Sequence, residues 1–231
     1  MPNRPIFKLG SRLKTCANFV TMNSRIVDVG TDHAYLPIWL AKSNIVKFAI
    51  ASDLREGPLI AARANINKYN VQDKVEARLS DGLSKIDSDE IDEVIIAGMG
   101  GELIIDIISK SLWIKDKKLI LQPMTSSQKL REFLEEKSIF LTDEKVVEED
   151  GKIYSVMYIK PNQNNVVYND LYPYIGLITN NMDGMVIKYI KKEIKHLNNK
   201  IKGLVFNGKY IEASLLRNVV DKLNRICNEE N

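Results

Sequence analysis

Five short apolar segments alternate with helix-like segments between residues 25 and 160, and this alternation restricts the fold more than any other feature. The strand-like segments are residues 25–30, 47–53, 74–82, 91–101 and 118–124. Helices are predicted between them over residues 33–42, 56–69, 102–112 and 126–138. Strands separated by helices form a parallel sheet that is covered on both faces. The pattern therefore predicts an α/β fold with a doubly wound, Rossmann-like sheet.

Residues 139–160 contain two more strand-like segments, which are joined near Asp150-Gly151. An Asp-Gly pair between two such segments is typical of a hairpin turn, so we expect an antiparallel hairpin at the end of the sheet. The composition changes after this hairpin. We therefore divide the chain into a ligand-binding domain, residues 1–162, and a second domain, residues 163–231.

The second domain is predicted to be a helical hairpin. Its apolar residues recur in steps of four and three, as in a coiled coil, at Ile190, Ile194, Leu197, Ile201 and Leu204. A second apolar stripe follows Asn207-Gly208 and comprises Leu215, Leu216, Val219, Leu223 and Ile226. Two antiparallel helices packed along these stripes are the simplest arrangement. An intermolecular coiled coil is the alternative, and we expect a monomer or a weak homodimer.

The composition argues against several classes of protein. The 231 residues include only two cysteines, Cys16 and Cys227, which stand near opposite ends of the chain. Neither a disulfide framework nor a metal site is predicted from them. No apolar run approaches the roughly 18 to 20 residues of a membrane span, and the first residues do not have the pattern of a secretory signal. We therefore expect a cytoplasmic protein without membrane contacts.

Basic residues are concentrated at both ends of the chain, although the net charge is only +3. Residues 1–25 contain no acid and five cations, which are Arg4, Lys8, Arg12, Lys14 and Arg25. Six lysines lie between residues 188 and 202, among them Lys195 and Lys202. These two basic segments are suited to binding a polyanion, because phosphates attract Lys and Arg side chains. A solvated helix face explains the lysines equally well.

The predicted parallel strands end in acids and glycines, namely Asp28, Gly30, Asp53, Asp81 and Gly98. The carboxyl ends of parallel strands share one edge of the sheet, where nucleotide ligands bind. A glycine at position 30 allows a tight turn and a close approach to a ligand. Asp53 follows it by 23 residues, about where an acid binds ribose hydroxyls in dinucleotide folds.

These acids also restrict the chemistry of the ligand. A carboxylate repels phosphate, but it accepts hydrogen bonds from hydroxyl and ammonium groups. The edge therefore favours S-adenosylmethionine, which has a ribose and a cationic amino-acid end and lacks phosphate. Purely structural roles remain as alternatives: Asp28 caps a turn, Asp53 caps the helix at 56, and Asp81-Gly82 forms a common turn.

Several motifs together resemble the bacterial tRNA (adenine-22-N1)-methyltransferase family. They are DVGTDHAYLP (28–37), ASDLREGPLIAARANI (51–66), LSDGL (79–83), VIIAGMGGELI (94–104) and LILQPM (119–124). The resemblance covers nearly the whole chain and is loosest in the tail. It implies a class I methyltransferase fold, with S-adenosylmethionine as donor and N1 of an adenine in the D-arm region of tRNA as acceptor. The second domain would then aid tRNA binding.

The resemblance also assigns cofactor-binding residues. Asp28 and Gly30 stand in the first cofactor loop, and Asp53, followed by Leu54, stands at the ribose. The other assigned positions are Asp81 and Gly82 at the adenine, and Gly98 and Met99 at the methyl-transfer face. The segment after the fourth strand reads Ala-Gly-Met-Gly. It lacks the Asn/Asp-Pro-Pro-aromatic turn that methyltransferases acting on adenine N6 share, so transfer to N6 is disfavoured.

Asp32 is our candidate for the catalytic carboxylate. N1 methylation leaves the ring cationic, and a nearby carboxylate stabilises this charge or accepts a proton from N6. We expect His33 to position the base or the loop, and Tyr35 to stack on a flipped base. The alternatives are an N-cap role for Asp32 in the helix predicted at 33, a first-turn position for His33 and a core position for Tyr35. The candidate tRNA contacts are Tyr35, Arg4, Lys8, Arg12, Lys14, Lys195 and Lys202.

Two other functions remain open at this stage. A nicotinamide-dependent Rossmann oxidoreductase shares the sheet, but the sequence lacks the G-x-G-x-x-G turn, and the terminal hairpin is not expected there. A non-catalytic adaptor that binds S-adenosylmethionine and RNA would retain the same cofactor residues. Methyl transfer to tRNA distinguishes the methyltransferase from both.

Overall fold

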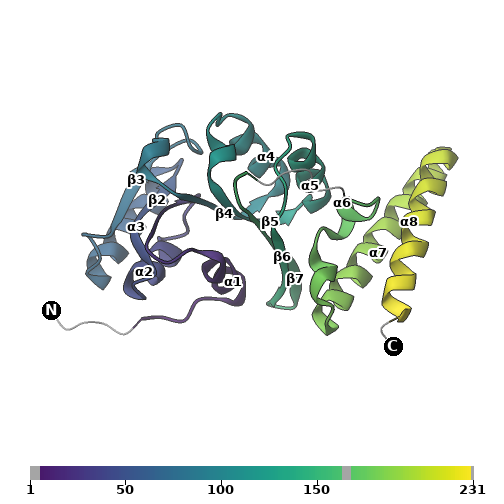
Figure 1. Ribbon diagram of the computed structural model, residues 1–231, viewed down its shortest axis with the longest axis horizontal. Coiled ribbons are helices and arrows are strands. Elements are labelled where there is room, and N and C mark those ends of the chain that lie inside the picture. The colour runs from purple at the N-terminus through teal and green to yellow at the C-terminus, as the bar shows by residue number, and fades with distance from the viewer. Residues whose placement is uncertain (1–5, 163–167, 230–231) are drawn as a thin grey trace.

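The computed structural model describes residues 6–162 and 168–229 and contains one seven-stranded sheet (Figure 1). The strand order is β3-β2-β1-β4-β5-β7-β6, with the first five strands parallel and β7 and β6 antiparallel. The strands are β1 (Ser24–Val29), β2 (Val46–Asp53), β3 (Val75–Leu79), β4 (Glu93–Gly100), β5 (Lys118–Thr125), β6 (Asp143–Glu149) and β7 (Lys152–Ile159). The predicted doubly wound sheet with a terminal antiparallel hairpin is confirmed.

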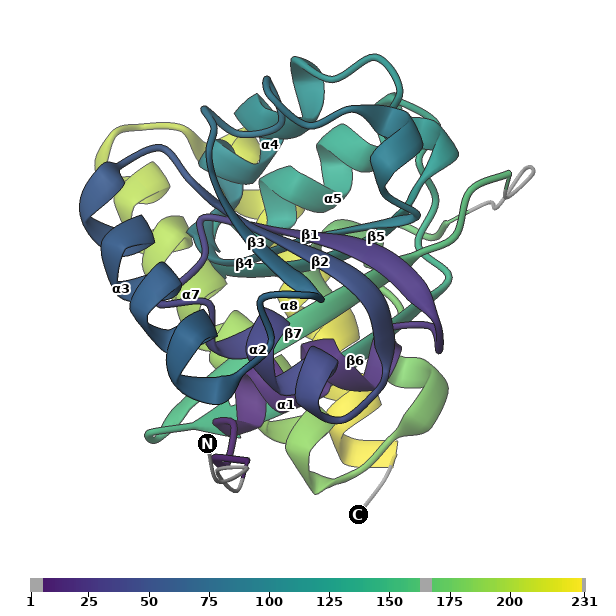
Figure 2. The ribbon, with the colours of Figure 1, turned by 90° about the vertical axis from the view of Figure 1, so that its left-hand side faces the viewer.

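Helices cover both faces of the sheet, as Figure 2 shows. One face carries α1 (Ser11–Phe19), α2 (Tyr35–Lys42) and α3 (Glu56–Tyr69), and the other carries α4 (Gly101–Ser109) and α5 (Ser127–Glu136). The central strands are apolar on both sides because successive side chains point to opposite faces. Ile26 packs with the first set of helices, and its neighbour Val27 packs with the second. Short 3-10 turns lie at η1 (Ser88–Glu90), η2 (Ile114–Asp116) and η3 (Ile178–Asn181).

The C-terminal part of the chain forms an antiparallel helical pair beside the hairpin (Figure 1). After α6 (Tyr172–Ile175) it comprises α7 (Gly184–Phe206) and α8 (Tyr210–Glu229). Asp183 caps α7, since its carboxylate accepts hydrogen bonds from the first-turn amides of Met185 and Val186. The predicted helical hairpin is thus present. Its division from the rest of the chain near residues 162–163 stays a prediction, because residues 163–167 lie outside the described residues.

One detail of the predicted α8 stripe is wrong. Leu215 is 62% exposed, and the buried residues are Ala213, Leu216, Val220, Leu223 and Cys227. These five still follow steps of three and four, so the coiled-coil spacing holds in a shifted register. The sequence pattern was ambiguous because Leu215-Leu216 and Val219-Val220 are adjacent apolar pairs. Leu215 is exposed, whereas Val219 and Ile226 are partly buried against the same cluster as Leu216 and Val220.

The helical pair is joined to the sheet by a buried ion pair. Arg131 of α5 and Glu144 of β6 have fully buried side chains 2.7 Å apart. The Arg131 guanidinium also donates to Tyr189 Oη of α7 and to the main-chain carbonyls of Pro173 and Tyr174. Because its partners come from the sheet, from α6 and from α7, Arg131 holds the C-terminal helices against the sheet.

Candidate active site

The turn after β1 is shaped by Gly30, whose φ of +71° lies in the region that favours glycine. A Cβ at this position would overlap the terminal methyl of Met99, which lies near the end of β4. Gly30 and Met99 therefore pack against each other at the carboxyl ends of two adjacent strands. The glycine is required here because any larger residue would displace the Met99 side chain.

Asp28 is buried under the same turn, 6% exposed. Its Oδ2 accepts a hydrogen bond of 2.7 Å from Thr31 Oγ1, and the Thr31 amide donates to the carbonyl of Ser52. Burial raises the pKa of Asp28 to about 6, and the Thr31 hydrogen bond opposes the shift. Asp28 therefore has the structural role that was considered as the alternative, since it ties the turn together, and its contact with the cofactor stays a prediction.

The DHAYLP segment departs from the predicted helix at 33–42. His33 and Ala34 both have left-handed backbone, with φ of +55° and +58°, and α2 begins only at Tyr35. Pro37 explains the later start, because a helix beginning at 33 would need an amide hydrogen from Pro37 for the His33 carbonyl. That carbonyl accepts instead from Asn65 Nδ2 of α3, at 3.0 Å. Two consecutive left-handed non-glycine residues are costly and cluster at functional sites.

Asp32, His33 and Tyr35 have exposed side chains, whereas Ala34, Leu36 and Pro37 are buried. Asp32 does not cap α2, since the N-cap is Ala34 and no side-chain cap hydrogen bond forms. Its side chain is 80% exposed and lies 3.6 Å from His33 Nε2. The His33 ring stacks on Tyr35, and Tyr35 meets Phe7 edge-on. Tyr35 is 38% exposed, so the alternative prediction that it is a core residue is wrong. The N-cap alternative for Asp32 is wrong as well.

The β2 and β3 ends meet beside β1. Asp53 Oδ1 accepts from the Arg55 amide at 2.8 Å, and the Asp53 carbonyl accepts from the Ser80 amide that precedes Asp81. Arg55 is the N-cap of α3, and the Asp53 side chain forms a turn before it, so the predicted N-cap role for Asp53 is wrong in detail. Leu54 is 63% exposed and offers an apolar surface next to this carboxylate.

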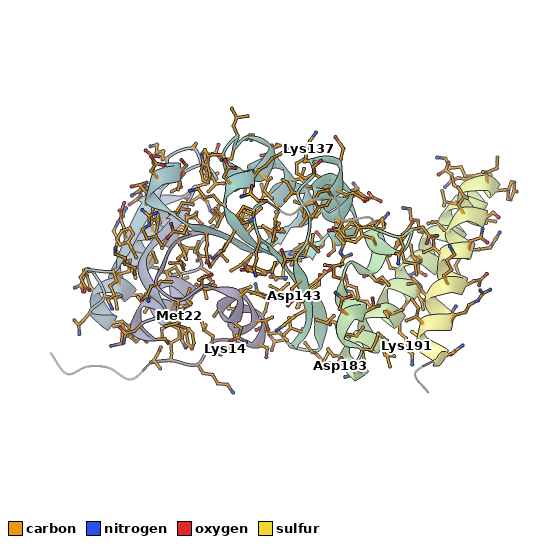
Figure 3. The ribbon with its side chains drawn as sticks, in the orientation of Figure 1. Lys14, Met22, Lys137, Asp143, Asp183 and Lys191 are labelled. Carbon is orange, nitrogen blue, oxygen red and sulfur yellow. The ribbon has the colours of Figure 1, made fainter. Side chains whose placement is uncertain are left out.

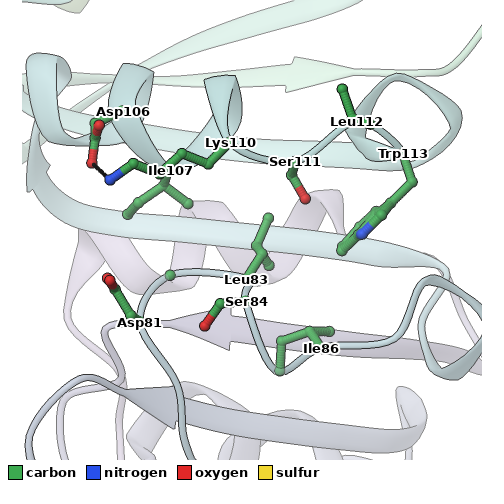
Figure 4. A pocket seen from close by; sticks show the side chains of 11 residues that line it. Asp81, Leu83, Ser84, Ile86, Asp106, Ile107, Lys110, Ser111, Leu112 and Trp113 are labelled. Atoms are coloured by element: carbon green, nitrogen blue, oxygen red, sulfur yellow. Dashed lines mark hydrogen bonds and ion pairs between the residues drawn. The ribbon is translucent and has the colours of Figure 1, made fainter.

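A pocket of about 350 Å³ opens beside Asp81 (Figure 4). Asp81, Gly82 and Leu83 line one side, and Ile107 and Trp113 line the other. Gly82 has a φ of +54°, and a Cβ there would lie 3.3 Å from Ile107. The lining is mixed, because Ser84, Ser111 and the Asp106–Lys110 ion pair stand beside the apolar residues. The Asp81 carboxylate suits an amine on a ligand in this pocket.

The β4 end is arranged by two predicted residues, Gly98 and Arg12, and by two residues that were not predicted, Gln122 and Glu149. Gly98, with a φ of +80°, donates its amide to the buried Gln122 Oε1 of β5 at 3.0 Å. The same oxygen accepts from Arg12 Nη1 of α1 at 2.8 Å, and Arg12 Nε also pairs with Glu149. Gln122 could have been predicted, because it is a lone amide in the apolar run LILQPM (119–124). No sequence pattern indicates a role for Glu149.

The other candidate tRNA residues lie outside this edge. Lys8 and Lys14 are exposed, and the Lys14 ammonium lies over the Trp39 ring. Lys195 and Lys202 are exposed on α7, and Arg4 falls outside the described residues. Figure 3 shows Lys14 and Lys191 toward the lower edge of the view, on α1 and α7 respectively.

The edge fits S-adenosylmethionine better than a phosphate-bearing cofactor. It combines a glycine turn that a Cβ would fill, carboxylates at three strand ends and a pocket whose Asp81 carboxylate suits an amine. Among the described residues, no group of three or more His, Cys, Asp or Glu could hold a metal ion. No helix in the described part of the chain is long and apolar enough to cross a membrane.

Comparison with known proteins identifies the class of protein to which this chain belongs. The family model described as a methyltransferase domain matches residues 9–157, in agreement with the sheet order and the acidic, glycine-rich edge. A tRNA (adenine(22)-N(1))-methyltransferase of Bacillus subtilis is 34% identical over 176 residues, 74% of this chain and 73% of that protein. The chain belongs to this tRNA (adenine(22)-N(1))-methyltransferase family, and the predicted resemblance is confirmed.

Solved structures agree over almost the full length. A putative tRNA (m1A22) methyltransferase of Streptococcus pneumoniae has a TM-score of 0.85 and 28% identity, covering 95% of this chain and 100% of that one. The M. capricolum TrmK in complex with S-adenosyl-homocysteine has a TM-score of 0.81 and 27% identity, covering 97% and 99%. These relationships favour the methyltransferase over the oxidoreductase and the adaptor.

Proposed function

We propose that this chain transfers a methyl group from S-adenosylmethionine to N1 of adenine 22 in tRNA. The observation that carries the proposal is the family relationship: a curated relative named for this reaction matches three quarters of the chain at 34% identity. The edge described above supports it, because its donor and acceptor groups suit a ribose, an ammonium and an adenine.

The donor, when bound, supplies an electrophilic methyl group on a sulfonium. We assign its ribose to Asp53 and Leu54, its adenine to Asp81 and Gly82, and its amino-acid end to Asp28 and Gly30. Gly98 and Met99 border the methyl-transfer face. Gly30 has no side chain on this face, and the Met99 side chain packs against it there.

Asp32 and His33 complete the proposed site. N1 of adenine has a lone pair in the ring plane, so transfer requires alignment with the methyl group more than removal of a proton. Positive charge then develops on the ring. The Asp32 carboxylate is available to stabilise it, because it is 80% exposed and, within residues 6–162 and 168–229, it contacts His33 Nε2 at 3.6 Å. His33, which is stacked on Tyr35, holds the loop or the base in position.

The tRNA is proposed to reach the site across the helical pair. A groove of about 520 Å³ runs between Met124 and Thr125 of β5, the hairpin around Lys152, and Lys192 of α7. Lys192 Nζ donates to the Ile153 carbonyl at 2.8 Å, which places its charge at the hairpin. Exposed lysines such as Lys195 continue along α7, and Lys8 and Lys14 extend the basic surface on the α1 side. We further propose a cytoplasmic monomer or weak homodimer that acts on soluble tRNA.

The direct test is tritium transfer from labelled S-adenosylmethionine to unmodified tRNA, followed by mapping of the modified nucleotide. We expect N1-methyladenosine at position 22 and no transfer to the same tRNA with guanine there. Asp32→Asn should lower the rate and leave donor affinity unchanged, which an adaptor would not explain. Transfer to a different nucleotide, or none to any tRNA at saturation, would refute the proposal.

The role of the helical pair needs point substitutions rather than truncation. Removal of residues 163–231 would leave the buried Arg131–Glu144 pair without Tyr189 and the carbonyls of α6. Paired Lys195→Gln and Lys202→Gln substitutions should weaken tRNA binding and leave donor binding intact. Unchanged tRNA affinity would remove these lysines from the interface.

A further inference from the structure

The loop that carries Asp32 and His33 is held by two residues from other parts of the chain. We propose that Phe7, in the segment before α1, and Asn65, in α3, are positioning residues for methyl transfer. They act through this loop rather than by contact with the reacting atoms. The inference rests on the proposed function, because it takes Asp32 and His33 as the residues that face the adenine.

The loop needs support from outside because its main chain is strained. His33 and Ala34 have φ of +55° and +58°, a conformation that is costly for residues other than glycine and persists only where the surrounding structure imposes it. The Tyr35 amide closes the turn by donating to the Asp32 carbonyl at 3.1 Å, but no side chain caps α2. Contacts with other elements must therefore fix the directions of Asp32 and His33.

Asn65 provides the first of these contacts, from α3. Its Nδ2 donates at 3.0 Å to the carbonyl of His33, across 32 residues of sequence. This is the carbonyl that Pro37 leaves without a helical partner. The hydrogen bond thus acts directly on a residue with left-handed backbone and on the peptide that follows its imidazole.

Phe7 provides the second contact, through the Tyr35 ring. The two rings meet edge-on with centroids 5.3 Å apart, and Phe7 meets Tyr69, at the end of α3, in a similar way at 5.2 Å. Tyr35 in turn stacks on the His33 imidazole, with centroids 5.7 Å apart and planes 10° from parallel. Aromatic pairs prefer such defined geometries. A continuous row of four rings therefore runs from Tyr69 through Phe7 and Tyr35 to His33.

The segment that carries Phe7 is itself fixed. Leu9 is buried, and a Cβ on Gly10 would overlap Glu149 Oε1, so the main chain passes close to the end of β6. Glu149 also accepts from the Arg12 amide at 3.1 Å, in the first turn of α1. Phe7 therefore stands on a segment whose position is set by the packing of α1 against the sheet.

The exposure of the row points to a role at the site. Tyr35 is 38% exposed, the side chains of His33 and Asp32 are 48% and 80% exposed, and Phe7 and Tyr69 are half-buried. Rings that served stability alone would gain more from full burial. The arrangement instead restricts the loop while its two polar side chains stay accessible, as alignment of an adenine with the methyl group requires.

Methyl-transfer assays with four variants test the inference. Phe7→Leu removes the ring and retains an apolar side chain, whereas Phe7→Tyr retains the ring. Asn65→Ala removes the hydrogen-bond donor. The matched control is Phe140→Leu, which removes a half-buried ring from the Phe140–Tyr168 pair, just before β6 and away from this loop.

We expect Phe7→Leu and Asn65→Ala each to lower the single-turnover rate at saturating tRNA and donor by about 10-fold, since a small misplacement of reacting groups has effects of this size or larger. Phe7→Tyr should retain most of the rate, and Phe140→Leu should retain all of it. Donor affinity, measured by titration calorimetry, should stay at the wild-type value in every variant. Urea denaturation should show no greater loss in Phe7→Leu than in Phe140→Leu.

A second measurement separates positioning from general structural support. Phe7→Leu is repeated in a protein that already carries Asp32→Asn and His33→Ala. The further loss of rate should disappear there, because residues that act as a unit are not additive. His33 is also one of two histidines in the chain, so NMR can follow its imidazole, whose resonances should shift in Phe7→Leu and not in Phe140→Leu.

Three results would overturn the inference. The first is a wild-type rate in Phe7→Leu. The second is an equal loss of rate with and without the Asp32 and His33 side chains, and the third is a loss of donor affinity by the same factor as the rate. A wild type that methylates no tRNA would refute the proposed function instead, so the two failures can be distinguished.

Discussion

Arg12 and Arg131 are each held by a glutamate of β6, and they differ in burial and in the number of acceptors that their terminal nitrogens engage. Arg131 and Glu144 are both fully buried, and the Arg131 terminal nitrogens donate to five acceptors from β6, β7, α6 and α7. Arg12 and Glu149 are each about one fifth exposed, and the Arg12 side chain donates to two acceptors.

This difference separates a buried cation from one that lies partly exposed at the edge of the sheet. A buried guanidinium whose terminal nitrogens are bonded within the protein contributes to the packing of the elements it joins. A partly exposed guanidinium at the edge of the sheet adds less to stability. Substitutions at the two sites should therefore differ in their effect on stability.

The largest effect is expected at Arg131. Arg131→Met leaves the Glu144 carboxylate buried without its cation and should lower the free energy of unfolding by about 3–5 kcal/mol. Urea denaturation measures this loss. The double variant Arg131→Met with Glu144→Met should recover much of it, because no buried charge remains. A loss near zero in the single variant would show that the pair is not important to the fold.

A glycine next to this pair gives the second prediction. Gly176 has a φ of +52°, and a Cβ there would overlap the Glu144 carboxylate and lie 2.6 Å from Arg131 Nε. Gly176→Ala should cost about 2–4 kcal/mol from backbone strain and overpacking. The matched control is Gly151→Ala, which has a φ of +70° with open space around it and tests the strain alone. Equal losses in both variants would mean that contact with the pair adds nothing.

Asp28 extends the comparison to carboxylates, because it is buried with no salt-bridge partner, unlike Glu144. Its pKa is raised from 3.8 to about 6, so the folded state retains a proton that the unfolded chain loses. Its contribution to stability is therefore greatest below pH 4, falls as the pH rises to about 6 and is constant above. Asp28→Asn should stabilise the free protein by about 2 kcal/mol at pH 7 and by much less at pH 4.

The same variant should bind S-adenosylmethionine more weakly at pH 7. In the wild type, donor affinity should rise with pH through about 6 as Asp28 ionises, and the variant should show a flatter profile. Thermal unfolding and titration calorimetry between pH 4 and pH 8 measure both effects. A wild-type stability that rises across this interval relative to the variant would contradict the assignment.

Arg12→Met should have the smallest effect on stability. The Arg12–Glu149 pair is partly exposed, and such pairs contribute roughly 0–1 kcal/mol. Urea denaturation should therefore place Arg12→Met close to the wild type and far from Arg131→Met. A loss as large as that of Arg131→Met would make Arg12 a structural residue and remove the contrast between the two sites.

Local patterns in the sequence were sufficient for most of the fold. The alternation of strands and helices, the Asp-Gly hairpin and the heptad spacing of α7 are all properties of neighbouring residues, and each corresponds to an observed element. The acids and glycines of the site also lay at predicted strand ends, and parallel topology then brings them to one edge. Their proposed roles go beyond location and await the measurements above.

The tertiary structure decided the parts that depend on distant pairs. Arg12 meets Gln122 and Glu149 across 110 and 137 residues, and Arg131 meets Tyr189 across 58. No periodicity encodes such contacts, so the sequence placed Arg12 among surface cations. The left-handed backbone at His33 and Ala34 is likewise stabilised by Asn65 of another helix. Periodicity determined the elements of this protein, whereas packing between them determined which charges stay buried and which are available at the site.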